Sequence, residues 1–260
     1  MAFFQYKGKK CYYEEYGEGE PLLFLHGNAA SSAMFSWGTE FYCKDYKVVY
    51  IDFLGHGRSE RVERLEADLW YDEAQQVIAF LTEKKYKKAS IIGTSGGALV
   101  AINVALERPD LVDKVIADSF EGERSLKSIT ENVAAEREAS KQDEGAREFF
   151  AAMHGEDWEH VVDCDTQAVI AHDKTVGAFF HKPLEELKAE ILLTGSREDE
   201  FVCALGDDYF DKVYGEILRK IGHGKMHLFQ KGGHPAMVSN AEQFIDLALE
   251  FLKEEEDGTE

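Results

Sequence analysis

The sequence predicts an α/β fold with one mostly parallel sheet of about eight strands and helices on both faces. Short apolar runs alternate with longer segments of helical period along its 260 residues, a pattern typical of a parallel sheet covered by helices. One stretch, from about residue 121 to about residue 186, contains charged amphipathic segments and no strand-like run. We expect this stretch to be a helical insertion over the sheet.

Eight apolar runs are expected to be strands, and each is bounded by Gly, Asp or Lys. The first two flank Lys7-Gly8-Lys9, a turn signal that predicts an antiparallel hairpin at the edge of the sheet. The runs are residues 3–6, 11–16, 22–25, 48–51, 90–92, 115–117, 191–193 and 226–229.

Helices are predicted between the runs from apolar residues that recur on one face. The helix expected over residues 70–81 carries Trp70, Ala74, Val77, Ile78 and Leu81. A second helical pattern covers residues 98–107. The last one covers residues 241–252, and Ser239 with Glu242 is expected to form a capping box at its start.

The chain is predicted to form a single domain with an insertion. Residues 1–120 and 187–253 would form the core, and residues 254–260 an acidic tail that frays. Residues 121–186 would form a lid, because their apolar side chains need a partner and a lid over a pocket would use them. These side chains are Phe149, Phe150, Met153, Trp158, Val161, Val162, Phe179 and Phe180.

Composition excludes several classes of partner. With 50 acidic and 29 basic residues the net charge is -21, which repels nucleic acid and anionic lipid. No run of 18 apolar residues and no signal peptide occurs, so we expect no membrane span and a cytoplasmic location. The cysteines show no CxxC spacing and are expected to be reduced thiols; they are Cys11, Cys43, Cys164 and Cys203.

The sharpest local motif is Gly93-Thr94-Ser95-Gly96-Gly97, a G-x-S-x-G sequence. It follows a predicted strand and precedes a predicted helix, which is the context that such a nucleophile motif requires. Glycines suit this turn because neighbouring backbone approaches closely. Ser95 is therefore the candidate nucleophile, and the alternative is a turn serine that caps the helix.

A nucleophilic serine needs a base and a carboxylate that orients the base. His234 follows the last predicted strand, and Asp199 follows the strand expected at residues 191–193. Both fall at the carboxyl edge of the sheet, where active sites of parallel sheets lie. Glu198 is the alternative acid, because either carboxylate could orient His234.

These motifs resemble the α/β-hydrolase superfamily, in particular its small single-domain esterases and acyl hydrolases. The resemblance covers nearly the whole chain and rests on four further segments besides the serine motif: residues 26–28 (HGN), 52–59 (DFLGHGRS), 194–199 and 233–234. It implies an α/β-hydrolase fold, a small acyl substrate and no cofactor. It also implies an oxyanion hole formed by the backbone N–H groups of Asn28 and Gly96, and structural roles for His56 and Arg58.

Several alternatives remain open at this point. Histidines in the insertion, near Asp163, Cys164 and Asp165, would suit a metal ion, but none shows tight ligand spacing, so no metal is expected. Glu121 follows the sixth strand and would pair either with a lid arginine, which we favour, or with a cationic group of the substrate. Ester, thioester, lactone, amide and C–C hydrolysis, a lyase and a small-molecule receptor are all compatible with these motifs. The sequence predicts no particular oligomeric state.

Overall fold

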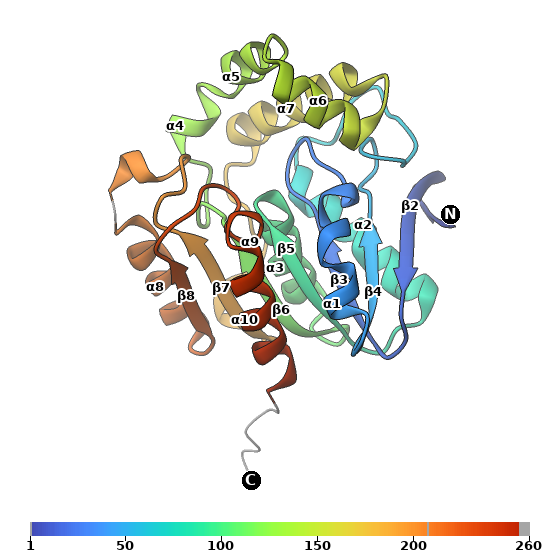
Figure 1. Cartoon of the computed structure of the whole chain (residues 1–260), viewed down its shortest axis with the longest axis vertical. Helices are drawn as coiled ribbons and strands as arrows, with labels where there is room; N and C mark the ends of the chain where they lie inside the picture. The colour runs from blue at the N-terminus through green and yellow to red at the C-terminus, as the bar shows by residue number, and fades with distance from the viewer. Residues whose placement is uncertain (1, 207, 255–260) are drawn as a thin grey trace.

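The computed structural model describes residues 2–206 and 208–254, apart from the side chain of Cys203, and contains one sheet (Figure 1). Its strands are β1 (Ala2–Tyr6), β2 (Lys9–Tyr16), β3 (Glu20–Leu25), β4 (Tyr46–Ile51), β5 (Ala89–Thr94), β6 (Val112–Asp118), β7 (Glu190–Ser196) and β8 (Lys225–Phe229). They lie in the order β1-β2-β4-β3-β5-β6-β7-β8. β2 pairs antiparallel with β1 and β4, and the other pairs are parallel. The eight predicted strands and the edge hairpin are confirmed.

Helices cover both faces of the sheet. α2, α3 and α8 pack on one face, and α1, α9 and α10 on the other. The helical segments are η1 (Ser32–Gly38), α1 (Thr39–Tyr42), α2 (Leu69–Lys84), α3 (Gly96–Glu107), α4 (Lys127–Thr130), α5 (Val133–Ser140), α6 (Glu144–His154), α7 (Trp158–Thr175), η2 (Leu184–Glu186), η3 (Cys203–Leu205), α8 (Tyr209–Ile221), α9 (Ala236–Ser239) and α10 (Ala241–Lys253).

The central strands are apolar on both faces because both faces are covered. In β3, Leu23 and Leu25 join the core beneath α2 and α3, whereas Leu22 and Phe24 join the core beneath α10. Successive side chains of a strand point to opposite faces. A strand between two helical layers therefore has a continuous apolar run instead of an alternating pattern.

The capping box predicted at the last helix is wrong. The chain first forms the short helix α9, and Ser239 is its last residue. The Ser239 hydroxyl donates to the carbonyl oxygen of Gly233 at 2.7 Å, so it binds backward into the preceding loop. Asn240 is the residue that precedes α10, and its side chain makes no capping bond.

Helices α4 to α7 lie over the carboxyl ends of the strands (Figure 1). Phe150, Trp158 and Val162 of this segment are buried together with Ala29 of the core, and Phe179 joins the main core. The apolar side chains of the insertion thus find partners in the core, although Phe149 remains 44% exposed. The predicted acidic tail lies outside the described residues from residue 255 onward. No described helix has the length and apolarity needed to cross a bilayer.

A buried carboxylate joins three segments at this edge. Asp118, the last residue of β6, accepts hydrogen bonds from the hydroxyls of Thr94 on β5 (2.9 Å) and Thr194 on β7 (2.7 Å) and from the N–H of Met237 on α9 (3.1 Å). Burial raises the pKa of Asp118 to about 6 although these hydrogen bonds oppose the shift. The side chain is therefore mostly ionised at neutral pH.

We expect Asp118→Ala to lower the free energy of unfolding by about 2–4 kcal/mol, because it leaves buried donors without an acceptor. Asp113→Ala on the same strand is the matched control, since Asp113 is partly exposed and pairs with Lys88 at 3.4 Å. It should cost less than about 1 kcal/mol. Urea unfolding followed by circular dichroism measures both, and equal losses in the two variants would contradict the role of Asp118.

Candidate active site

Ser95 lies on a tight turn between β5 and α3. Its backbone has φ 55° and ψ −124°, a strained conformation for a residue with a side chain. The turn is possible because Gly97 packs against β3, where an added Cβ would lie 2.1 Å from the carbonyl oxygen of Leu25. The Ser95 N–H donates to the Asp118 carbonyl oxygen at 2.8 Å. The Ser95 hydroxyl makes no capping bond to α3, so the alternative of a helix cap is wrong.

His234 and Asp199 are brought together from separate loops. The Nδ1 atom of His234 lies 2.8 Å from Oδ2 of Asp199, and the two side chains are 16% and 1% exposed. Phe201 packs edge-on against the His234 ring, with 4.7 Å between centroids. The His234 N–H also donates to the Glu200 carboxylate at 2.9 Å. These contacts fix both the position and the orientation of the imidazole.

Glu198 lies away from the imidazole. Its carboxylate accepts from the Lys231 ammonium at 2.6 Å and from the Gly232 N–H at 3.3 Å, on the exposed side of the loop. Of the two acids that the sequence offered, the structure therefore brings Asp199 to His234.

The pKa of His234 is set by two opposing effects. Burial alone would lower it, but the hydrogen bond and the charge of Asp199 outweigh burial, and the pKa is raised above its ordinary value of 6.5. The Nδ1 proton faces Asp199, so Nε2 is the ring atom left to take a proton from another group.

Asn28 and Gly96 lie beside Ser95 in the wall of one cavity. The Asn28 side chain is fixed on both sides, because its Oδ1 accepts from the Trp70 indole at 3.1 Å and its Nδ2 donates to Asp165 at 3.0 Å. Within residues 2–206 and 208–254, neither the Asn28 N–H nor the Gly96 N–H donates to another protein group. Both amides are therefore available to a bound molecule.

Asp165 on α7 ties the insertion to the loop that carries Asn28. Its Oδ2 atom accepts from the Asn28 side chain, from the Ala29 N–H at 3.1 Å and from His56 Nε2 at 3.3 Å. The side chain is fully buried. His154 on α6 binds the same loop, because its Nε2 lies 3.1 Å from the Ala29 carbonyl oxygen. Burial lowers the pKa of His154 to about 4, so this imidazole is neutral.

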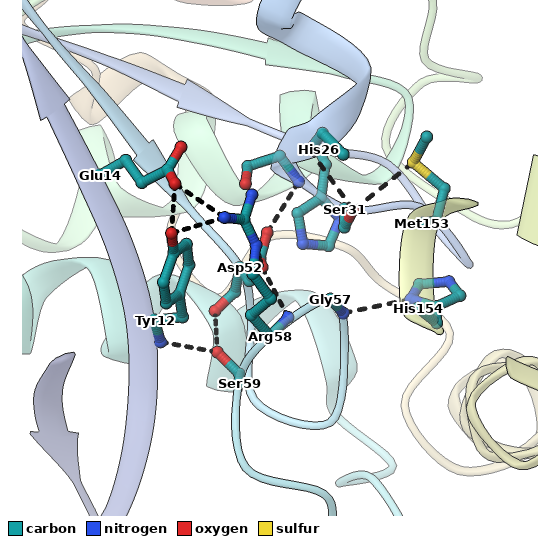
Figure 2. Close-up of polar contacts among 12 residues, drawn as sticks. Tyr12, Glu14, His26, Ser31, Asp52, Gly57, Arg58, Ser59, Met153 and His154 are labelled. Atoms are coloured by element: carbon teal, nitrogen blue, oxygen red, sulfur yellow. Dashed lines mark hydrogen bonds and ion pairs between the residues drawn. The ribbon is translucent and has the colours of Figure 1, made fainter. Parts of the chain in front are cut away.

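The loop from residue 52 to residue 59 forms a further network of polar contacts, which reaches His154 through the Gly57 N–H (Figure 2). The Asp52 carboxylate accepts from the N–H groups of Ser32 (2.8 Å) and Arg58 (2.7 Å). The Arg58 guanidinium lies over the Tyr12 ring and donates to Glu14 at 2.7 Å. Arg58 and His56 thus contact protein groups, in line with the structural roles expected for them.

The cavity around Ser95 has a volume of about 760 Å³. Ser95, Asn28, Gly96, Asp199 and His234 all line it, so the structure gathers these five candidate residues in one place, whereas Glu198 lies outside it. Its roof comes from the insertion, through Ile129, Val133, Phe149, Phe150 and Met153.

The structure gives no support to a metal site in the insertion, because no three potential ligand side chains gather among the described residues. His181, for example, stacks on Tyr71 and pairs with Asp68 at 2.6 Å. The described thiols Cys11, Cys43 and Cys164 form no disulfide.

Glu121 departs from its favoured prediction. The salt bridge to a lid arginine is wrong, since no described lysine or arginine pairs with Glu121, and its side chain lines the cavity. Burial raises its pKa to about 7, an effect that the negative charge of Asp199 adds to and His234 opposes.

Asp165 is a contact residue of the site that the sequence did not predict. A signal was present, because an acid stands on the apolar stripe of α7 between Val162 and Val169.

Comparisons with known proteins indicate the family of the chain. A family model described as the alpha/beta hydrolase family matches residues 22–247. Serine hydrolase BPHL of Homo sapiens is 24% identical over 258 residues, which cover 95% of this chain and 84% of that protein. The 2-hydroxy-6-oxo-6-phenylhexa-2,4-dienoate hydrolase of Comamonas testosteroni is 25% identical over 274 residues, covering 94% and 91%.

A solved structure shares the fold. It comes from a study of carboxylesterases of Nitrososphaera gargenis and superposes with a TM-score of 0.76 at 17% identity, covering 96% of this chain and 97% of that chain. Both of the curated relatives described above are hydrolases by name, which supports the same broad class for this protein. From the family match over most of its length and this shared fold, we conclude that the chain belongs to the alpha/beta hydrolase family.

Proposed function

We propose that the protein is a serine hydrolase that cleaves a small carboxylic ester or a related acyl substrate. The observation that carries the proposal is the His234–Asp199 pair, at 2.8 Å, in the wall of the same cavity as Ser95 on its strained turn. This is the combination of nucleophile, base and orienting acid that acyl transfer requires.

In this mechanism, Nε2 of His234 takes the proton of the Ser95 hydroxyl as its oxygen attacks the substrate carbonyl carbon. Asp199 holds the imidazole in the tautomer that allows this transfer and stabilises the imidazolium that results. The imidazolium then protonates the leaving alcohol, and an acyl-enzyme remains on Ser95. Water, deprotonated by His234, releases the acid.

The backbone N–H groups of Asn28 and Gly96 would hold the oxyanion of the tetrahedral intermediate. Two such donors would each lower the barrier by about 2.7–4 kcal/mol. Helices α4 to α7 would act as a lid that roofs the cavity and excludes water. The apolar side chains of the roof suit an aliphatic or aromatic acyl group.

C–C hydrolysis is the second candidate, because one relative is named as a dienoate hydrolase. A dienoate carries a carboxylate. The charged residues that line the cavity of this chain are Glu121, Glu136, Arg137, Asp199 and Glu200. One guanidinium against four carboxylates disfavours an anionic substrate, so ester cleavage is the preferred proposal.

A fluorophosphonate probe should add to the wild-type protein once and to Ser95→Ala not at all, because only an activated serine attacks phosphorus readily. Intact-protein mass spectrometry measures the adduct, and p-nitrophenol release from acetyl, butyryl and octanoyl esters reports turnover and acyl length. Ser90→Ala, on the same strand, is the control that should still be labelled. A folded wild type that stays unlabelled and turns over no ester would contradict the proposal and favour a receptor or a lyase.

The pH dependence of kcat/KM should show an acid limb above pH 6.5, because His234 must be neutral to act as a base and its pKa is raised. Asp199→Asn removes the charge that raises this pKa, so the limb should move to lower pH while kcat falls by about 10³–10⁴-fold. Glu198→Gln should change neither. An acid limb that moves only in the Glu198 variant would show that Glu198 is the orienting acid.

Asp165→Ala should lower kcat by about tenfold or more with a smaller change in KM, because the Asn28 loop loses two hydrogen bonds and the oxyanion donor is no longer held. Asp165→Asn should restore part of kcat, since an amide oxygen can occupy the place of Oδ2. Asp163→Ala, on the exposed side of α7 where Asp163 pairs with Lys141, is the control. Steady-state kinetics would contradict this role of Asp165 if the Asp165→Ala and Asp165→Asn variants have the same kcat, or if only KM changes in Asp165→Ala.

A further inference from the structure

Glu121 lies in the segment that follows β6, the strand between the two that precede Ser95 and Asp199. It follows β6 by three residues, and β6 pairs with β5 and β7. The neighbouring Ser119 hydroxyl accepts from the Ala236 N–H at 2.8 Å, so this segment also touches the loop of His234. The Glu121 carbonyl oxygen accepts from the Tyr209 hydroxyl at 2.7 Å, which fixes the backbone.

Among the described residues the Glu121 carboxyl group forms no ion pair, although its own backbone hydrogen bond and the charge of His234 both act to lower its pKa. No described Lys, Arg or His forms an ion pair with it, whereas nearby Glu123 pairs with Lys220. The side chain faces the cavity, and burial raises its pKa to about 7. A partly buried carboxylate without an opposite charge is less favourable than one in water, so the site gains when a bound molecule supplies a positive charge.

The other charged residues of the cavity do not supply a positive charge to Glu121. Arg137, the only lysine or arginine among the described lining residues, lies over the Phe150 ring at 5.6 Å from its centroid. Asp199 is engaged by His234, and Glu200 accepts from the His234 N–H. The cavity is therefore negative overall, in a chain of net charge -21.

The aromatic side chains in the walls of the cavity also suit a cation. Aromatic side chains attract ammonium groups through their ring faces, and quaternary ammonium most of all, because it keeps little water. Aromatic residues that line the cavity are Trp37, Trp70, Phe120, Phe149, Phe150, Phe201 and Phe210.

We propose that Glu121 is a specificity-determining residue and that the cavity takes esters which carry an ammonium group, with that group paired to the Glu121 carboxylate. This inference rests on the proposed ester hydrolysis and names its substrate class. The proposed selectivity differs from the general attraction of cations to a negatively charged protein, because it depends on a single carboxylate inside the cavity.

The experiment compares esters that have the same shape and differ only in charge. Acetylcholine and 3,3-dimethylbutyl acetate place the difference on the alcohol side. Betaine ethyl ester and ethyl 3,3-dimethylbutanoate place it on the acyl side. At pH 8, where Glu121 is mostly ionised, the wild type should favour the cationic member of at least one pair by tenfold or more in kcat/KM, after correction for spontaneous hydrolysis.

Glu121→Gln should reduce that preference to about twofold or less, mainly by raising KM for the cationic ester, and should change kcat/KM for the neutral ester less than threefold. Glu131→Gln is the matched control, because it removes one exposed acid of the insertion outside the cavity. It should keep the wild-type preference. A wild-type preference below twofold in both pairs, or one that survives in Glu121→Gln, would overturn the inference.

Calorimetric binding of choline and 3,3-dimethylbutanol separates this inference from the proposed reaction. Choline should bind the wild type at least tenfold more tightly than the neutral alcohol, and Glu121→Gln should abolish the difference. If Ser95 is unlabelled and no ester is hydrolysed but choline discrimination depends on Glu121, ester hydrolysis fails and the cation site stands. If esters are hydrolysed without any charge preference and choline does not bind selectively, the cation site fails and the hydrolase stands.

Discussion

The buried carboxylate of Asp118 is the interaction on which the geometry of the site depends. It binds groups on β5, β7 and α9 at once, and these segments adjoin Ser95, Asp199 and His234. Hydrogen bonds are short and directional, so the three loops cannot shift independently of one another. The raised pKa of Asp118 reflects the free-energy cost of burying this charge. The three hydrogen bonds that it accepts offset part of this cost and fix three segments of the chain.

A second buried carboxylate, Asp165, works across the boundary between core and insertion. Asn28 stands between the Trp70 indole of the core and the Asp165 carboxylate of α7, so its loop belongs to neither part alone. Hydrogen bonds to an ionised group are stronger than neutral ones. The insertion is therefore held by directional polar contacts as well as by the apolar contacts of Phe150 and Trp158. An oxyanion donor placed in this loop would be correctly oriented only while the insertion is docked.

The strands and the serine turn could be predicted from the sequence because they depend on local patterns: apolar runs between turn residues, and glycines where backbones touch. Contacts between distant segments could not. Asp199 and Glu198 are adjacent in sequence, and only the path of the loop sends one to His234 and the other to Lys231. Ser239 and Glu242 have the spacing of a capping box, but an extra turn of helix before α10 placed Ser239 elsewhere. For Glu121, no pattern in the sequence shows whether a cation will face it.

The charge of Glu121 constrains the chemistry as well as the choice of substrate. A carboxylate in the wall of the cavity opposes the negative charge that develops on a tetrahedral intermediate, and this repulsion weakens as the distance between the two charges grows. Either a proton or a substrate cation removes it. With a pKa of about 7, protonation removes only part of the charge at neutral pH, whereas an ammonium group held against the carboxylate removes its field while the acyl group reacts. The same contact that binds such a substrate would thus also keep the carboxylate from opposing its cleavage, while the selectivity for a cationic ester would appear mainly in KM.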